Sequence, residues 1–311
     1  MLDSLKLTLF SRRLLLVSAT AWALLGGQAY AADKLPVVAS FSILGDLVRV
    51  VGGECVTVFT LVGPDEDAHV FEPKPADARA LLAAKLVVTN GLGFEPWANK
   101  LLKSAGYKGQ TVVAAQGVTA RPMNESKAQA SHAHAEQDPH AWQNPNNVVL
   151  YVRNIAAALS QADAGGASRY QANAEAYVKE LQTLDAWAKA QIASIPLAKR
   201  KVITSHDAFG YFALQYGVQF LAPQGVNTES EPSAKQVARL IRQIQKEKIR
   251  AVFVENMANP RLIAQLSKDA GVTLGASLYA DALSSSDQPG ATYLQMMRHN
   301  VTKLVDGMAL N

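Results

Sequence analysis

Short apolar stretches rich in β-branched residues alternate with amphipathic stretches along most of the chain. In the first half, strands are predicted over residues 35–40, 56–62, 85–90 and 111–115, and helices over 43–51, 75–84, 97–104 and 146–159. In the second half, strands are predicted over residues 202–204, 218–221, 251–255 and 273–278, and helices over 210–216, 234–247, 260–270 and 293–306. This order predicts an α/β protein with parallel sheets covered by helices.

Between the two halves, Arg169–Ile195 has helical periodicity and contains neither Gly nor Pro. An apolar face marked by Tyr177, Leu181, Leu184 and Trp187 predicts one long helix. We therefore expect an N-terminal lobe over residues 32–166, a linking helix over 167–195 and a C-terminal lobe over 196–311. The ligand cleft should lie between the lobes. A single linking helix resists wide closure, so we expect only local rearrangement or slight rocking on binding.

The first 31 residues have the three-part pattern of a secretory signal peptide. Basic residues precede the apolar run Leu14–Leu25, and Ala29–Ala31 fits an A-x-A cleavage site. A membrane anchor is the alternative, but the run has 12 residues, whereas a span needs about 20. No cysteine lies at the cleavage point, so we expect no lipid anchor there. The mature protein should begin near Ala32 in the periplasm.

Charge and cysteine content exclude several classes of function. Of the formal net charge of +4, half comes from residues 1–31, so the 311-residue chain has no charge signature of a nucleic-acid partner. Cys55 is the single cysteine. It excludes an internal disulfide framework, a Cys-rich zinc site and an iron–sulfur cluster.

Four candidate metal ligands occupy comparable positions. His69, His206 and Asp281 each follow a predicted strand, and open parallel sheets bind ligands beyond the carboxyl ends of their strands. His140 lies between Pro139 and Trp142, which make its surroundings rigid. Three imidazoles and a carboxylate suit Zn²⁺, and also Mn²⁺ or Fe²⁺. The alternatives are ordinary surface or core histidines and, for the aspartate, a helix cap.

Catalysis is not expected. Ser205-His206-Asp207 cannot act as a nucleophilic triad, because three consecutive residues cannot align in the required relay. A periplasmic metallohydrolase would need an open coordination position and a general base, for which Glu72 or Glu255 could be nominated. Neither lies in a recognised catalytic signature, and four protein ligands leave little room for a reactive water.

Six segments together resemble the cluster A-I substrate-binding proteins, the zinc and manganese receptors of ABC importers. The resemblance runs in order along nearly all of the mature chain. It is carried by Asp67–Asp77 (DAHVFEPKPAD), Asn90–Trp97 (NGLGFEPW), Asp138–Trp142 (DPHAW), Ser205–Phe209 (SHDAF), Glu231–Ser233 (EPS) and Leu278–Leu283 (LYADAL).

The resemblance implies two lobes bridged by a rigid helix, with the metal buried between them. Carried over by position, the ligands are His69, His140, His206 and Asp281. Zinc-associated members have His at the third position, which favours Zn²⁺ over Mn²⁺, although relatives with this ligand set accept both metals. The loop before the second signature is short for a zinc receptor and holds only two histidines. We expect those two, His132 and His134, to have a modest role in metal capture.

The resemblance also implies the partners, a membrane permease with its ATPase, and a monomeric receptor. A receptor for ferrous iron or a metal chelate and an adhesin-type interaction protein are the alternatives within the same fold. Imidazoles bind metal only when neutral, so affinity should fall as the pH drops below about 6.5.

Overall fold

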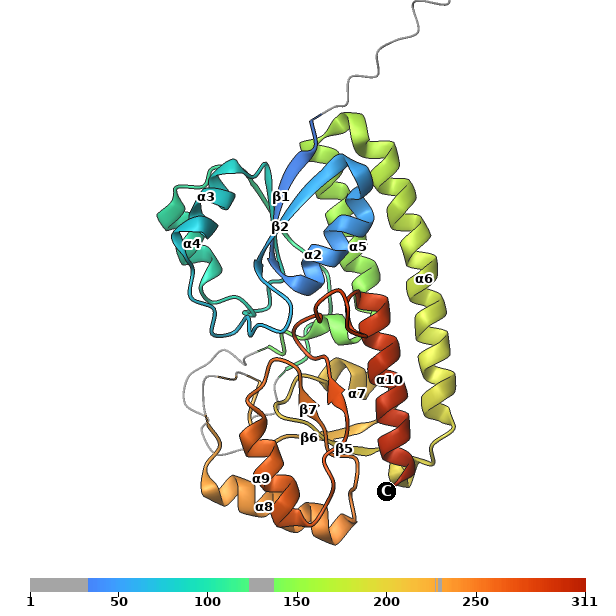
Figure 1. Ribbon diagram of the computed structural model, residues 1–311. Helices are drawn as coiled ribbons and strands as arrows, with labels where there is room; N and C mark the ends of the chain where they lie inside the picture. Colours follow the sequence, from blue (N-terminus) through green and yellow to red (C-terminus); the bar gives the residue numbers. More distant parts are fainter. Residues whose placement is uncertain (1–32, 123–136, 227, 229–230) are drawn as a thin grey trace, which may run out of the picture. The chain divides into compact units, whose positions relative to one another are not determined.

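A four-stranded parallel sheet, in the order β2-β1-β3-β4, forms the centre of the first half of the chain (Figure 1). The computed structural model describes residues 33–122, 137–226, 228 and 231–311. The elements of the first half are β1 (Leu35–Phe41), α2 (Ser42–Gly52), β2 (Val56–Val62), α3 (Pro75–Ala83), β3 (Leu86–Thr89), α4 (Ala98–Ala105), β4 (Gln110–Val113) and α5 (Pro145–Ala162). The predicted α/β fold with parallel sheets is confirmed.

The second half contains two short parallel pairs, β5-β6 and β7-β8, rather than one long sheet. An isolated bridge between Ile203 and Val252 links them. The elements are β5 (Lys201–Ile203), α7 (Gly210–Tyr216), β6 (Gln219–Leu221), α8 (Ala234–Glu247), β7 (Val254–Glu255), α9 (Pro260–Ala270), β8 (Ser277–Leu278) and α10 (Tyr293–Ala309).

The strands predicted over 251–255 and 273–278 are therefore too long, since only two residues of each are strand. Gly275 explains the difference. Its amide donates to the carbonyl oxygen of Val252 at 2.7 Å, and a Cβ there would lie 2.9 Å from the ring of Phe253. The two segments approach each other too closely at Gly275 to leave room for a side chain. Regular pairing of β7 with β8 therefore begins only beyond this residue.

Helix α6 (Ala167–Ala193) has 27 residues and runs beside elements of both halves, packing against α2, α5 and α10 (Figure 1). Leu181 and Leu184 of its predicted apolar face are fully buried. Trp187 is half-buried and stacks under the guanidinium of Arg298 at 5.0 Å. Asp185 accepts hydrogen bonds from side chains of α7, at 2.7 Å from Gln215 and 3.1 Å from Tyr216. The helix is thus fixed to both halves along its length.

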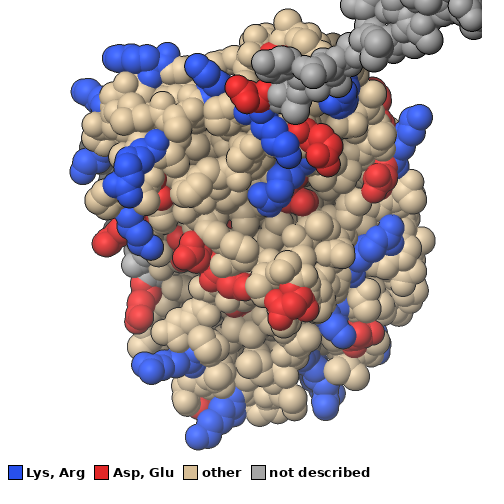
Figure 2. Space-filling model, turned by 45° about the horizontal axis from the view of Figure 1, so that its top comes forward, with Lys and Arg blue, Asp and Glu red and all other residues tan. Residues whose placement is uncertain are grey.

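Residues 34–311 form one compact unit, and one continuous apolar core extends through both halves of it. Leu44 of α2, Leu184 of α6 and Tyr293 of α10 belong to this core, while α8 and α9 enclose a second, smaller one. In the described ranges, no helix has the length and apolarity that a membrane span requires. Figure 2 shows basic and acidic side chains interspersed over one face, without a continuous basic patch.

Candidate metal centre

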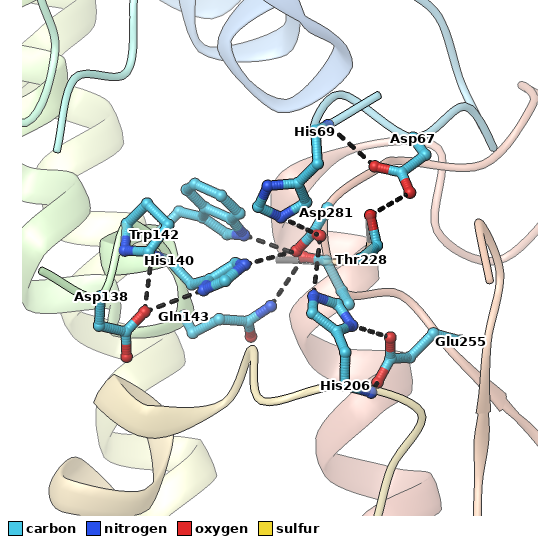
Figure 3. Close-up of polar contacts among 12 residues, drawn as sticks. Asp67, His69, Asp138, His140, Trp142, Gln143, His206, Thr228, Glu255 and Asp281 are labelled. Carbon is cyan, nitrogen blue, oxygen red and sulfur yellow. Dashed lines mark hydrogen bonds and ion pairs between the residues drawn. The ribbon is translucent and has the colours of Figure 1, made fainter. Parts of the chain in front are cut away.

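The four predicted ligands converge on one point, although each comes from a different segment (Figure 3). His69 follows β2, His206 follows β5 and Asp281 follows β8, so each lies beyond the carboxyl end of a parallel strand. His140 directly precedes the 3-10 turn Ala141–Gln143, which leads into α5. One candidate ligand atom from each residue lies within 4.8 Å of the other three, and all four residues are buried.

Asp281 is at the centre of this cluster. Its Oδ2 lies 3.0 Å from Nε2 of His206 and 3.3 Å from Nε2 of His69, and its Oδ1 lies 3.5 Å from Nε2 of His140. Neither carboxylate oxygen and none of these nitrogens has a well-oriented hydrogen-bond partner among the described residues. Buried polar atoms normally have partners. Five such atoms facing one point fit a cation held by three nitrogens and a carboxylate.

Two of the histidines are oriented by a second carboxylate. Asp138 Oδ1 lies 2.9 Å from Nδ1 of His140, and Oε2 of Glu255 contacts Nδ1 of His206 in the same way. Both carboxylates are fully or almost fully buried. An imidazole that donates from Nδ1 to a carboxylate presents the lone pair of Nε2 to a metal, and the carboxylate raises its basicity. The geometry therefore prepares both rings as ligands.

The carboxylates also shift the protonation of the cluster. Burial alone would lower the pKa of His140, but the negative charges of Asp281 and Asp138 outweigh it and raise that pKa to about 9. At His206, burial is likewise outweighed by Glu255 and Asp281, so its pKa lies well above the usual 6.5. Burial would raise the pKa of Asp281, but His206 and His140 hold it well below its usual value. Without metal, the neighbouring carboxylates therefore favour the protonated forms of His140 and His206.

Side chains of the first half hold the backbone next to Asp281 in place. Trp142 Nε1 and Gln143 Nε2 both donate to the carbonyl oxygen of Ala280, at 2.9 and 2.8 Å. Tyr293 in turn donates from its hydroxyl to the carbonyl oxygen of Trp142 at 2.7 Å. The segment carrying His140 thus also positions the residue before Asp281, which couples two candidate ligands across the cluster.

Aromatic rings close one side of the cluster. Phe94 packs edge-on against His69 with ring centroids 4.8 Å apart, and Trp142 packs against His140 at 5.3 Å. Phe94 and Trp142 also contact each other and are fully buried. This wall keeps water from the buried side, and low polarity strengthens the attraction between a bound cation and Asp281.

The residues nominated for catalysis do not assemble a catalytic site. Glu255 is occupied by His206 and by the backbone amides of Ser205 and His206. Glu72 is exposed. The backbone amide of Asp207 donates to the carbonyl oxygen of Gly225, and Asp207 is not one of the residues that converge on the cluster.

His132 and His134, expected to help in metal capture, lie outside the described residues.

The orienting role of Asp138 and Glu255 was not predicted from the sequence. A signal was present for the first, because Asp67 and Asp138 both stand two residues before a candidate ligand. Each accepts a hydrogen bond from the backbone amide of that histidine, at 2.9 Å for His69 and 3.0 Å for His140. The other carboxylate oxygen of Asp67 accepts a hydrogen bond from the hydroxyl of Thr228 at 2.8 Å, a contact that joins the two halves (Figure 3).

Glu255 is 49 residues from its partner His206, and nothing in the local sequence indicates the pairing.

Known relatives share nearly the whole chain. Residues 37–307 match the family described as "Zinc-uptake complex component A periplasmic". The manganese-binding lipoprotein MntA of Halalkalibacterium halodurans is 34% identical over 283 residues, covering 91% of each chain. The iron ABC transporter substrate-binding lipoprotein MtsA of Streptococcus pyogenes is 31% identical over 288 residues, covering 91% of this chain and 92% of the relative.

Solved structures agree with this relationship. The periplasmic zinc-binding protein TroA of Treponema pallidum superposes with a TM-score of 0.81 at 27% identity, covering 89% of this chain and 99% of the other. A Mn-bound periplasmic metal-binding protein from Candidatus Liberibacter asiaticus gives a TM-score of 0.77 at 29% identity, covering 89% and 100%. The chain belongs to this family of substrate-binding components of metal ABC transporters, and it is therefore not an enzyme.

Proposed function

We propose that the protein captures one divalent transition-metal ion between its two halves and delivers it to the permease of an ABC importer. The metal is the transported substrate, and the ligands are His69, His140, His206 and Asp281. The observation that carries the proposal is the convergence of three unpartnered imidazole nitrogens and an unpartnered carboxylate at one buried point. The family supplies the partners, a membrane permease and its ATPase.

Zn²⁺ is the favoured ion and Mn²⁺ the next. Three nitrogens and a single carboxylate match the preference of zinc, whereas Mn²⁺ prefers a larger share of oxygen ligands. The relatives include proteins named for manganese, iron and zinc, so membership of the family does not identify the metal. The four residues are at most 6% exposed, which favours a bare ion over a bulkier organic chelate.

The remaining parts of the proposal concern place and organisation. We place the protein in the periplasm, with residues 1–31 as a cleaved signal peptide. Residues 32–166 and 196–311 form the two lobes, residues 167–195 link them, and the receptor acts as a monomer. Fixed along both halves, α6 supports a receptor that binds metal with little closure of its lobes.

Metal competition on the purified, metal-stripped protein tests the proposal. Zn²⁺, Mn²⁺ and Fe²⁺ are titrated separately and together, and the bound metal is measured by elemental analysis. We expect one tightly bound Zn²⁺ per chain that Mn²⁺ does not displace. His206→Ala should weaken binding by more than about 100-fold, the upper end of the cost of losing an outer-sphere partner. Preferred binding of Mn²⁺ or Fe²⁺ would overturn the zinc assignment, and no binding of any ion would overturn the site.

A further inference from the structure

The four proposed ligands are not equally enclosed. His140, His206 and Asp281 have no exposed surface, whereas His69 is 6% exposed. Carboxylates hold the Nδ1 atoms of His140 and His206, but no described side chain hydrogen-bonds the imidazole of His69 at Nδ1. Of the three imidazoles, that of His69 is therefore the nearest to solvent and the one that no described carboxylate holds at Nδ1. A bound ion would leave the site past this residue.

The loop that carries His69 is fastened to the second half of the chain through Asp65. The backbone amide of Asp65 donates to the carbonyl oxygen of Leu283 at 2.9 Å, and its Oδ1 accepts from Nδ2 of Asn256 at 2.7 Å. Asp65 has a φ of 57°, a left-handed conformation that few residues other than Gly, Asn and Asp adopt. The contacts with the second half therefore hold a sharp turn of the loop.

Asn256 lies where three ligand-bearing segments meet. It directly follows Glu255, which orients His206. Its side-chain Nδ2 also approaches the carbonyl oxygen of Ala282, the residue after Asp281, at 3.3 Å. Its backbone amide donates to the carbonyl oxygen of Leu278 at 2.9 Å. This one residue therefore connects the loop of His69 to the segments that hold His206 and Asp281, and in the described part of the chain no hydrogen bond joins its side chain to a ligand side chain.

We infer that the hydrogen bond between Asp65 and Asn256 is a latch that sets the rate at which the metal leaves past His69; this inference rests on the proposed function. While the latch is closed, the loop cannot carry His69 away from the other three ligands. When it opens, His69 moves with its loop, and the ion keeps only three ligands beside an opening to solvent. Asp65 and Asn256 are thus positioning residues for metal release. Since Asp65 is exposed, losing the bond should cost the fold little.

The test is the rate of Zn²⁺ release from the loaded protein into an excess of a chromogenic chelator, followed by stopped flow. Asn256→Asp preserves the size of the side chain but places a second carboxylate against Asp65. We expect release to become about tenfold faster, equivalent to ~1.4 kcal/mol. Asp65→Gly should have a similar effect, because glycine accepts the positive φ and only the carboxylate is lost. This second variant applies if the first one folds poorly.

A reversed pair separates a latch from general damage. The double variant Asp65→Asn/Asn256→Asp restores one donor and one acceptor with the direction reversed, and release should return to within about twofold of wild type, well inside the ~1.4 kcal/mol of a tenfold change. Asn99→Asp is the matched control, since it makes the same charge change on an exposed residue of α4 and should leave the rate unchanged.

The outcomes distinguish the latch from the function on which it rests. Wild-type release rates in both Asn256→Asp and Asp65→Gly would overturn the latch while leaving the metal site intact. Equally fast release from the reversed pair and from Asn256→Asp would also overturn it. If the wild-type protein bound no Zn²⁺, the proposed function would fall, and the latch with it.

Discussion

The two sides of the metal centre are built differently. On the enclosed side, His140 and His206 are buried and each is held by a carboxylate, and Asp281 lies between them. On the open side, His69 sits in a loop whose restraints include the hydrogen bonds that join Asp65 and Asp67 to the second half of the chain. Affinity and release need not be set by the same residues. We expect the enclosed side to determine how strongly a cation is held and the open side to determine how fast it leaves.

The largest expected effect concerns the enclosed side and follows from the pKa of His140. Folding raises this pKa from 6.5 to about 9, so the protonated ring stabilises the metal-free fold below pH 6.5. That stability is lost as the pH rises through 9, and the free energy of unfolding should fall by about 3 kcal/mol. Urea unfolding of the metal-free protein between pH 6 and pH 10 measures the change.

A variant and a metal control isolate this contribution. His140→Gln should reduce the dependence of the unfolding free energy on pH, because one of the two histidines with a raised pKa is gone and only His206 remains. Zinc-loaded wild type should show no such fall, since the metal replaces the proton and binds more strongly as competition from protons weakens. Equal unfolding free energies at pH 6 and pH 10 in the metal-free protein would contradict the charge arrangement of the enclosed side.

The next effect compares the two aspartates that precede a ligand by two residues. Asp138→Asn removes the charge that orients and polarises His140, and Zn²⁺ affinity should drop by about 10–100-fold. Asp67→Asn is the matched variant, because among the described residues Asp67 accepts hydrogen bonds from the backbone amide of His69 and the hydroxyl of Thr228 and not from an imidazole. Its affinity should fall much less. Calorimetric titration measures the Zn²⁺ affinity of both variants. Equal losses of affinity would contradict the difference between the enclosed and the open side.

Much of this architecture was predictable because its signals are local. The predicted bounds of the strand over 56–62 and of the helices over 210–216, 234–247 and 260–270 match the structure. Ser233 caps α8 through the amide of Gln236, and Asn259 caps α9 next to Pro260. Helix ends of this kind are set by a few adjacent residues, so a single sequence can locate them.

The features missed from the sequence depend on contacts between distant segments. The short strands β7 and β8 result from the close approach of Gly275 to Val252, which no apolar pattern reveals. The four candidate ligands could be nominated because each stands in a recognisable segment. Glu255 and Asn256 could not, because their partners His206 and Asp65 lie 49 and 191 residues away. Side chains that support a site are chosen by tertiary packing, which leaves little local trace.

The smallest effect tests whether the long helix limits the movement of both sides. Helix α6 packs against α2, α5 and α10, and Asp185 ties it to α7. We expect the radius of gyration from small-angle X-ray scattering to be nearly the same with and without Zn²⁺, because only the loop of His69 has to move. A large compaction on adding Zn²⁺ would show that the halves hinge as rigid bodies and that release is not a local event.

The most direct test of the central claim is X-ray absorption spectroscopy of the protein loaded with one equivalent of Zn²⁺. We expect three imidazole nitrogens and one or two carboxylate oxygens at about 2.0–2.2 Å from the zinc ion. Asp281→Ala should remove the carboxylate shell and leave the imidazole scattering. A first shell made mainly of water oxygens, or one that Asp281→Ala leaves unchanged, would contradict the claim that His69, His140, His206 and Asp281 hold the metal.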